Sequence, residues 1–104
     1  MAGREVNIAL PDDFGPGMRK LAFIDGVQIV ILNVAGTLHA IENSCPHAGA
    51  SLASGKLEGL MLRCPSHGLK FNVADGCIAG GGAMRVQAYP IVAANGGAVL
   101  TLPE

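Results

Sequence analysis

Two short segments of this 104-residue chain each place a cysteine close to a histidine. The first segment has the pattern Cys-x-His, at Cys45 and His47, and the second has Cys-x-x-His, at Cys64 and His67. Two thiolates and two imidazoles make a complete ligand set for a tetrahedral zinc ion or for an iron–sulfur centre. These four residues are therefore the candidate metal ligands.

The mixed composition of each segment distinguishes between these two kinds of centre. A structural zinc site usually takes its cysteines from one segment and its histidines from another, whereas each segment here offers one of each. In a two-iron cluster, each segment can give its cysteine to one iron and its histidine to the other. The pattern favours a two-iron cluster and leaves a zinc site as the alternative.

Two further interpretations account for less of the pattern. A nucleophilic Cys–His pair needs one cysteine, so the second segment would have no role. Small buried cysteines and hydrogen-bonded loop histidines would be ordinary structural residues, but this leaves the repeated spacing unexplained. We expect structural roles for the two residues outside the set: Cys77 as a small core residue after a glycine turn, and His39 as the solvent-facing member of a strand.

The elements that must position these ligands are predicted to be strands. No 11-residue window keeps a 3.6-residue apolar period, and short β-branched runs recur between Gly, Pro, Asp and Asn residues, which is typical of an all-β fold. Two-residue turns are expected at 25–26, 35–36 and 95–96, where Asp-Gly, Ala-Gly and Asn-Gly stand. The expected strands are 6–9, 20–24, 27–34, 38–41, 60–63, 70–73, 86–94 and 98–102.

Length and charge limit the possible function classes. A chain of 104 residues fits a single domain, 1–104, in which the segment 43–84 is a specialised insertion that holds every cysteine. The formal net charge of −1 provides little attraction for nucleic acid or an anionic membrane. Without a secretory signal or a bilayer-spanning apolar run, the protein is expected in the cytoplasm, where three cysteines indicate metal or redox chemistry rather than disulfides.

The two ligand segments resemble the binding signature of Rieske [2Fe-2S] proteins. The resemblance extends over most of the chain and is strongest to the free-standing Rieske ferredoxins of bacterial aromatic-ring dioxygenase systems. It implies the Rieske fold, with antiparallel strands in stacked sheets or a flattened barrel and a smaller cluster-binding subdomain at about 43–84. The further segments that carry it are Phe14-Gly15-Pro16-Gly17, Gly49-Ala50-Ser51-Leu52, Asp75-Gly76 and Tyr89-Pro90.

The resemblance also implies a cofactor and a role. Cys45 and Cys64 would hold the buried iron, and His47 and His67 the outer iron, of one [2Fe-2S] cluster per chain. The protein would be an electron-transfer component rather than an enzyme, accepting electrons from an NAD(P)H-dependent flavoprotein ferredoxin reductase and delivering them to a terminal Rieske oxygenase in aromatic hydrocarbon catabolism. The alternative is a Rieske-like small subunit of a larger redox complex such as a nitrite reductase, but those subunits usually lack the four ligands.

Two positions depart from the pattern of relatives. High-potential Rieske proteins carry a serine and a tyrosine where this chain has Leu69 and Phe71. Without those hydroxyl donors, we expect a reduction potential near the low end of the roughly −150 to +300 mV Rieske range. Glycines at 80–82 replace a proline-rich segment that covers the cluster in relatives, so the cover is expected to be looser or to approach more closely.

Overall fold

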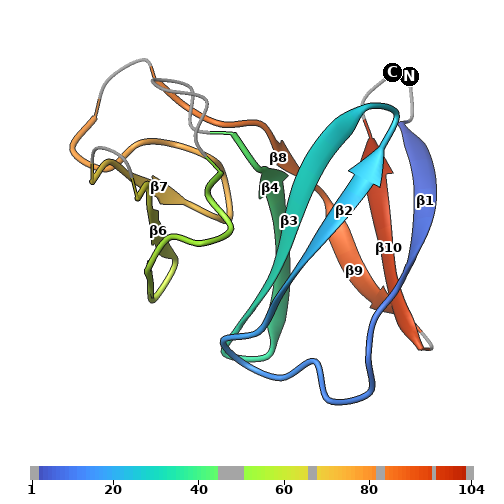
Figure 1. Cartoon of the computed structure of the whole chain (residues 1–104). Coiled ribbons are helices and arrows are strands. Elements are labelled where there is room, and N and C mark those ends of the chain that lie inside the picture. The colour runs from blue at the N-terminus through green and yellow to red at the C-terminus, as the bar shows by residue number, and fades with distance from the viewer. Residues whose placement is uncertain (1–2, 45–50, 66–67, 82–83, 95, 103–104) are drawn as a thin grey trace.

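The computed structural model describes residues 3–44, 51–65, 68–81, 84–94 and 96–102, which form three antiparallel sheets (Figure 1). The sheets have the strand orders β1-β10-β9, β2-β3-β4-β8 and β5-β6-β7. The strands are β1 (Arg4–Ala9), β2 (Arg19–Ile24), β3 (Val27–Val34), β4 (Thr37–Glu42), β5 (Leu57–Glu58), β6 (Met61–Arg63), β7 (Lys70–Asn72), β8 (Ala88–Tyr89), β9 (Ile91–Ala94) and β10 (Gly97–Leu102). The predicted all-β fold is confirmed. Within these ranges no helix is long and apolar enough to span a membrane.

Strand β3 lies at the centre of the fold because both of its faces are buried. Val30 and Leu32 belong to one hydrophobic core, which includes residues of the β5-β6-β7 sheet. Ile29 and Ile31 belong to a second core, which includes residues of the β1-β10-β9 sheet. A continuous apolar run is typical of a strand covered on both sides. The β2-β3-β4-β8 sheet therefore lies between the other two sheets (Figure 1).

Two tight turns set the register of this middle sheet. Asp25 and Gly26 join β2 to β3 with φ values of 52° and 80°, and Ala35 and Gly36 join β3 to β4 with φ values of 53° and 92°. Positive φ at both central residues matches the twist of an antiparallel hairpin. Both predicted turns are confirmed. In the third, Gly96 has a φ of 72°, and residue 95 lies outside the described residues.

The expected continuous strand at 86–94 is wrong because the chain changes sheets within it. Pro90 separates β8, which pairs with β4, from β9, which pairs with β10. Proline has no N–H with which to continue a ladder, whereas its carbonyl still accepts a 2.9 Å hydrogen bond from Thr101. The two-residue strand β5 was not expected because it is too short to show an alternating pattern. The other strands begin and end within two residues of their predicted bounds.

Two expectations about single residues are also wrong. Cys77 is exposed rather than part of the core. Its backbone forms an isolated β-bridge with Arg85, and the next residue, Ile78, is the one that packs against the core. His39 is partly buried rather than solvent-facing. It pairs with Leu32, on the face of the middle sheet that the first core covers. Desolvation by this burial lowers the pKa of His39 below its ordinary value.

Candidate metal centre

Cys64 lies at the start of the turn that joins β6 to β7, and its side chain is fully buried. Its backbone N–H donates a 2.6 Å hydrogen bond to the Leu69 carbonyl, and its own carbonyl accepts a 2.9 Å bond from the Gly68 N–H. These two bonds close the turn at its base. Gly68 has a φ of 73°, which glycine adopts without strain. His67 belongs to this closed segment in sequence but lies outside the described residues.

The first ligand segment connects β4 to β5. Cys45 and His47 lie outside the described residues, but both ends of the segment are described. Asn43, only 3% exposed, joins these ends. Its Oδ1 accepts a 2.7 Å hydrogen bond from the Ala53 N–H, and its Nδ2 donates to Ser51 Oγ at 2.9 Å. The Asn43 side chain therefore holds residues 43, 51 and 53 together around the segment that contains two of the predicted ligands.

The same side-chain amide also ties the segment to the middle sheet. Asn43 Nδ2 donates a second hydrogen bond, of 3.0 Å, to Gln28 Oε1. The Asn43 backbone N–H donates to the Gln28 carbonyl at 2.8 Å. Gln28 lies on β3, so these bonds anchor the entry of the ligand segment to the central strand of the fold.

Arg19 ties the exit of the ligand segment to strand β2. Its Nη1 donates hydrogen bonds to the Ala53 carbonyl at 2.7 Å and to the Gly55 carbonyl at 2.6 Å. The Gly55 N–H in turn donates to the Leu52 carbonyl at 3.0 Å. Bonds from a charged donor to buried carbonyls are stronger than neutral ones. Asn43 and Arg19 therefore connect the two ends of this segment to two adjacent strands of the middle sheet.

The ends of the two ligand segments meet in one hydrophobic core. Leu52, which follows the first segment, is fully buried in the same core as Cys64. Leu62 and Phe71, from β6 and β7, complete this part of the core, and neither is exposed to solvent. The fold therefore brings the exit of the first segment to the same place as the start of the second.

Sequence reasoning identified Cys64 but not the two residues that support the first segment. An asparagine two residues before a candidate ligand is a usable sequence signal, because its side chain can bond both to donors and to acceptors of the backbone. No comparable signal exists for Arg19. It lies 34 residues before Ala53 and reaches it only because β2 folds beside the ligand segment.

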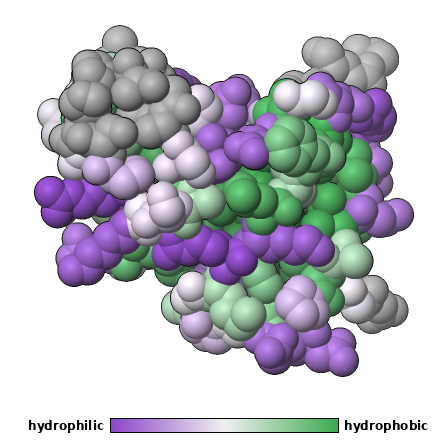
Figure 2. Space-filling view, viewed as in Figure 1, coloured by the Kyte–Doolittle hydropathy of each residue, from purple (hydrophilic) through white to green (hydrophobic). Residues whose placement is uncertain are grey.

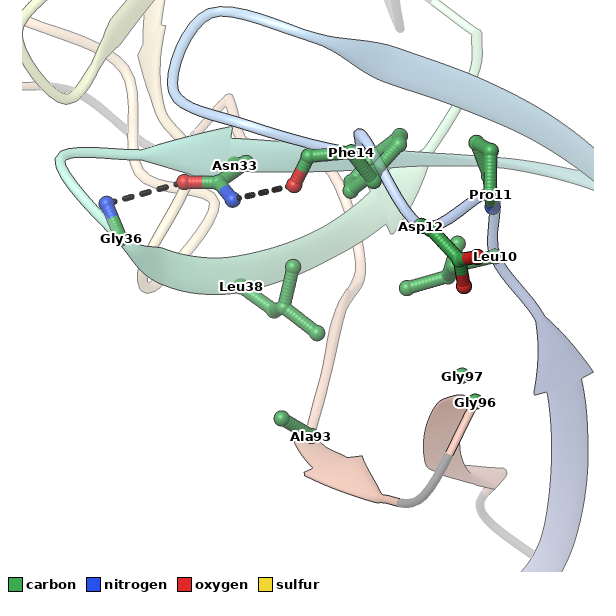
Figure 3. A pocket seen from close by; sticks show the side chains of 10 residues that line it. All are labelled: Leu10, Pro11, Asp12, Phe14, Asn33, Gly36, Leu38, Ala93, Gly96 and Gly97. Atoms are coloured by element: carbon green, nitrogen blue, oxygen red, sulfur yellow. Dashed lines mark hydrogen bonds between the residues drawn. The ribbon is translucent and has the colours of Figure 1, made fainter.

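A cavity of about 280 Å³ lies away from this site (Figure 3). It is lined by residues 10–12 and 14, by the turn between β3 and β4 and by the turn between β9 and β10. Asn33 stabilises its wall by donating to the Phe14 carbonyl and accepting from the Gly36 N–H, each at 2.9 Å. Among the described residues, Asp12 is its only ionisable lining residue, and Cys64 does not line it.

Comparison with known proteins assigns the family. The model of the Rieske [2Fe-2S] domain matches residues 4–90. This chain belongs to the Rieske [2Fe-2S] family. A curated relative of this Rieske protein, ferredoxin CarAc of Metapseudomonas resinovorans, is 32% identical over 72 residues, which cover 68% of this chain and 67% of the relative.

Solved structures of Rieske ferredoxins agree with the fold. The ferredoxin of carbazole 1,9a-dioxygenase from Nocardioides aromaticivorans IC177 matches with a TM-score of 0.81 at 30% identity, covering 96% of this chain and 98% of that one. A second match comes from a complex of reduced oxygenase and oxidised ferredoxin in carbazole 1,9a-dioxygenase. It has a TM-score of 0.81 at 24% identity and covers 92% and 100% of the two chains. At that identity the second match shows the fold alone.

A Rieske domain implies a [2Fe-2S] cluster, and the described residues fit one. A deprotonated thiol in an apolar core is costly unless a metal ion balances its charge. Cys64 is such a buried thiol, at the base of a turn that two backbone hydrogen bonds close. The side chains that follow it, Leu69 and Phe71, contribute no hydroxyl and pack in or against the same core. The burial of Cys64 therefore suits a metal-bound thiolate, to which Leu69 and Phe71 add no hydroxyl donor.

Proposed function

We propose that this chain is a one-electron carrier whose [2Fe-2S] cluster is bound by Cys45, His47, Cys64 and His67. When bound, the cluster takes up and releases a single electron. The observation that best supports the carrier role is the near-complete mutual coverage with a ferredoxin structure, 96% of this chain and 98% of that one.

The assignment of the ligands follows the two segments. Cys45 and Cys64 would hold one iron, the inner one, and His47 and His67 would hold the other. The environment of Cys64 supports this assignment, because its full burial suits an inner ligand. The chain's own contribution is to keep the two segments in place, through the backbone bonds of the Cys64 turn and the side-chain bonds of Asn43 and Arg19.

The partners we propose are a flavoprotein ferredoxin reductase as electron donor and a terminal Rieske oxygenase as acceptor. Support comes from the relatives, which include a ferredoxin of carbazole 1,9a-dioxygenase and a ferredoxin in complex with the oxygenase of such a system. On this proposal the chain acts in the cytoplasm as a single domain, 1–104, within a multicomponent system for oxidising aromatic compounds. The alternative remains a small subunit of a larger redox complex such as a nitrite reductase.

The test is to measure cluster content and electron transfer separately. The purified protein should be red-brown and contain about two iron and two acid-labile sulfide per chain. NADH with a flavoprotein ferredoxin reductase should reduce it, and the terminal oxygenase of a ring-hydroxylating system should reoxidise it. A colourless zinc protein would overturn the cluster assignment. Isolation of a red-brown chain in a permanent complex with a larger catalytic subunit would favour the alternative.

A further inference from the structure

Three basic residues stand side by side across the β5-β6-β7 sheet, at the end next to the Cys64 turn. Arg63 on β6 pairs directly with Lys70 on β7. On its other side, the Arg63 N–H donates a 2.9 Å hydrogen bond to the carbonyl of Lys56. The pairing of Leu57 with Leu62 continues to Lys56 and Arg63, so the three residues form one row. We call Lys56, Arg63 and Lys70 the cationic row.

The cationic row faces solvent. Residues directly opposite each other in a sheet share a face, and the next residue along each strand points to the other face. The next residues here are Leu57, Leu62 and Phe71, which pack in or against the first hydrophobic core. The three basic residues are exposed. Figure 2 shows hydrophilic side chains on the surface of the lobe that carries β6 and β7.

This arrangement does not serve folding. Like charges directly opposite each other in a sheet are destabilising. Among the described residues, one carboxylate pairs with the row: Glu58 Oε1 lies 3.7 Å from Lys70 Nζ, with both side chains about half exposed. An exposed pair of this kind contributes little to stability. The row therefore keeps a net positive charge that stability does not require.

The guanidinium of Arg63 lies against the ligand turn itself. A Cβ atom built on Gly68 would be 3.1 Å from Arg63 Nη2 and 3.2 Å from Nε. Gly68 directly follows the predicted ligand His67 in the sequence. The cationic row therefore begins at the surface of the second ligand segment, where a partner must approach to exchange an electron with the proposed cluster.

Positive charge is concentrated in the part of the chain that carries the cationic row. Between residues 43 and 86 the sequence has four basic and two acidic residues, whereas the remainder has three basic and six acidic residues. The overall net charge of −1 hides this difference. The region around the candidate metal centre is therefore positive, and the rest of the chain is negative.

We propose that the cationic row is a docking surface for an acidic, Asp/Glu-lined surface on the protein that exchanges electrons with this chain. The proposal rests on the proposed function, because the row derives its value from its position beside the cluster ligands. Complementary charges at the edge of an interface accelerate association and orient the partner, and salt screens them. Three cations next to the ligand turn would orient that turn toward the partner while leaving the complex short-lived.

The first experiment uses two small oxidants of opposite charge on the reduced holoprotein. The rate of oxidation by ferricyanide, an anion, is divided by the rate of oxidation by tris(phenanthroline)cobalt(III), a cation. This rate ratio should be higher at low salt than at high salt. The double variant R63E/K70E should lower this rate ratio roughly tenfold. K20E, which reverses one charge instead of two, on strand β2, should change it less than about twofold, whereas a general charge effect would change it about threefold. Equal effects of the two charge reversals would overturn a local role for the row.

The second experiment uses poly-L-glutamate as an acidic polypeptide probe of the holoprotein and measures binding rather than electron transfer. The protein should bind the probe at low salt, and R63E/K70E should lose this binding while K20E and R63K retain it. K56Q/K70Q provides a milder second variant that keeps the sheet free of new carboxylates. Stronger binding of duplex DNA than of poly-L-glutamate would overturn the proposal in favour of nucleic acid. Absence of the cluster with intact probe binding would refute the proposed function but not the charge of this surface.

Discussion

The side-chain oxygen of Asn43 accepts a 2.7 Å hydrogen bond from the backbone N–H of Ala53, ten residues later in the chain. The segment between these residues contains Cys45 and His47. The geometry of the first ligand segment therefore depends on a buried amide that is not itself a predicted ligand. Because Asn43 also bonds to Gln28 and Ser51, it links that segment directly to strand β3.

Replacement of Asn43 should weaken both the fold and metal retention. In N43A the Ala53 N–H loses its acceptor, and leaving a buried donor unsatisfied costs about 1–3 kcal/mol. For a chain of this size, each kcal/mol of destabilisation lowers the melting temperature by roughly 4–8 °C. The iron content of the purified protein and its loss to a chelator should show faster release from N43A. N7A, which alters an exposed asparagine on β1, is the control and should behave like the wild type.

The two described cysteines should differ sharply on replacement by serine. Cys64 is fully buried at the base of the ligand turn, whereas Cys77 is exposed. We expect C64S to be purified with little or no iron and without visible absorption. C77S should retain the iron content and spectrum of the wild type. Normal iron and sulfide in C64S would contradict its assignment as a ligand.

The reduction potential should lie near the low end of the roughly −150 to +300 mV Rieske range. Leu69 and Phe71 contribute no hydroxyl that could stabilise the added charge of a reduced cluster, and Phe71 is fully buried. A redox titration of the wild type should therefore give a midpoint below zero, and F71Y and L69S should each raise it. A wild-type midpoint well above zero would show that other donors compensate.

Acidification should destabilise the protein through His39. Burial lowers its pKa in the folded state, so the unfolded chain binds a proton more readily as the pH falls through the ordinary value of about 6.5. The stability contributed by neutral His39 is present above that pH and is lost below it. Between pH 7.5 and 5.5, the melting temperature of the wild type should fall more than that of H39Q. Equal decreases in both proteins would assign the acid sensitivity to other groups.

Much of the fold could be predicted because its signals are local. The Asp-Gly and Ala-Gly turns determine where β2, β3 and β4 begin and end, since the glycine of each turn accepts positive φ without strain. The continuous apolar run of β3 likewise predicts burial. The sequence could not show that the chain changes sheets at Pro90, because this change depends on which strands lie beside β8 and β9.

By itself, the sequence predicts the chemistry of this protein: two Cys–His segments, their spacing, and Leu69 and Phe71 in place of hydroxyl residues are all properties of neighbouring residues. Only the tertiary structure decided what supports and surrounds them. Asn43 reaches Ala53, Arg19 reaches Gly55, and Lys56, Arg63 and Lys70 form a row because strand register brings them together. Register depends on the burial of whole strands and on long-range pairing, so a pattern of individual residues does not reveal it.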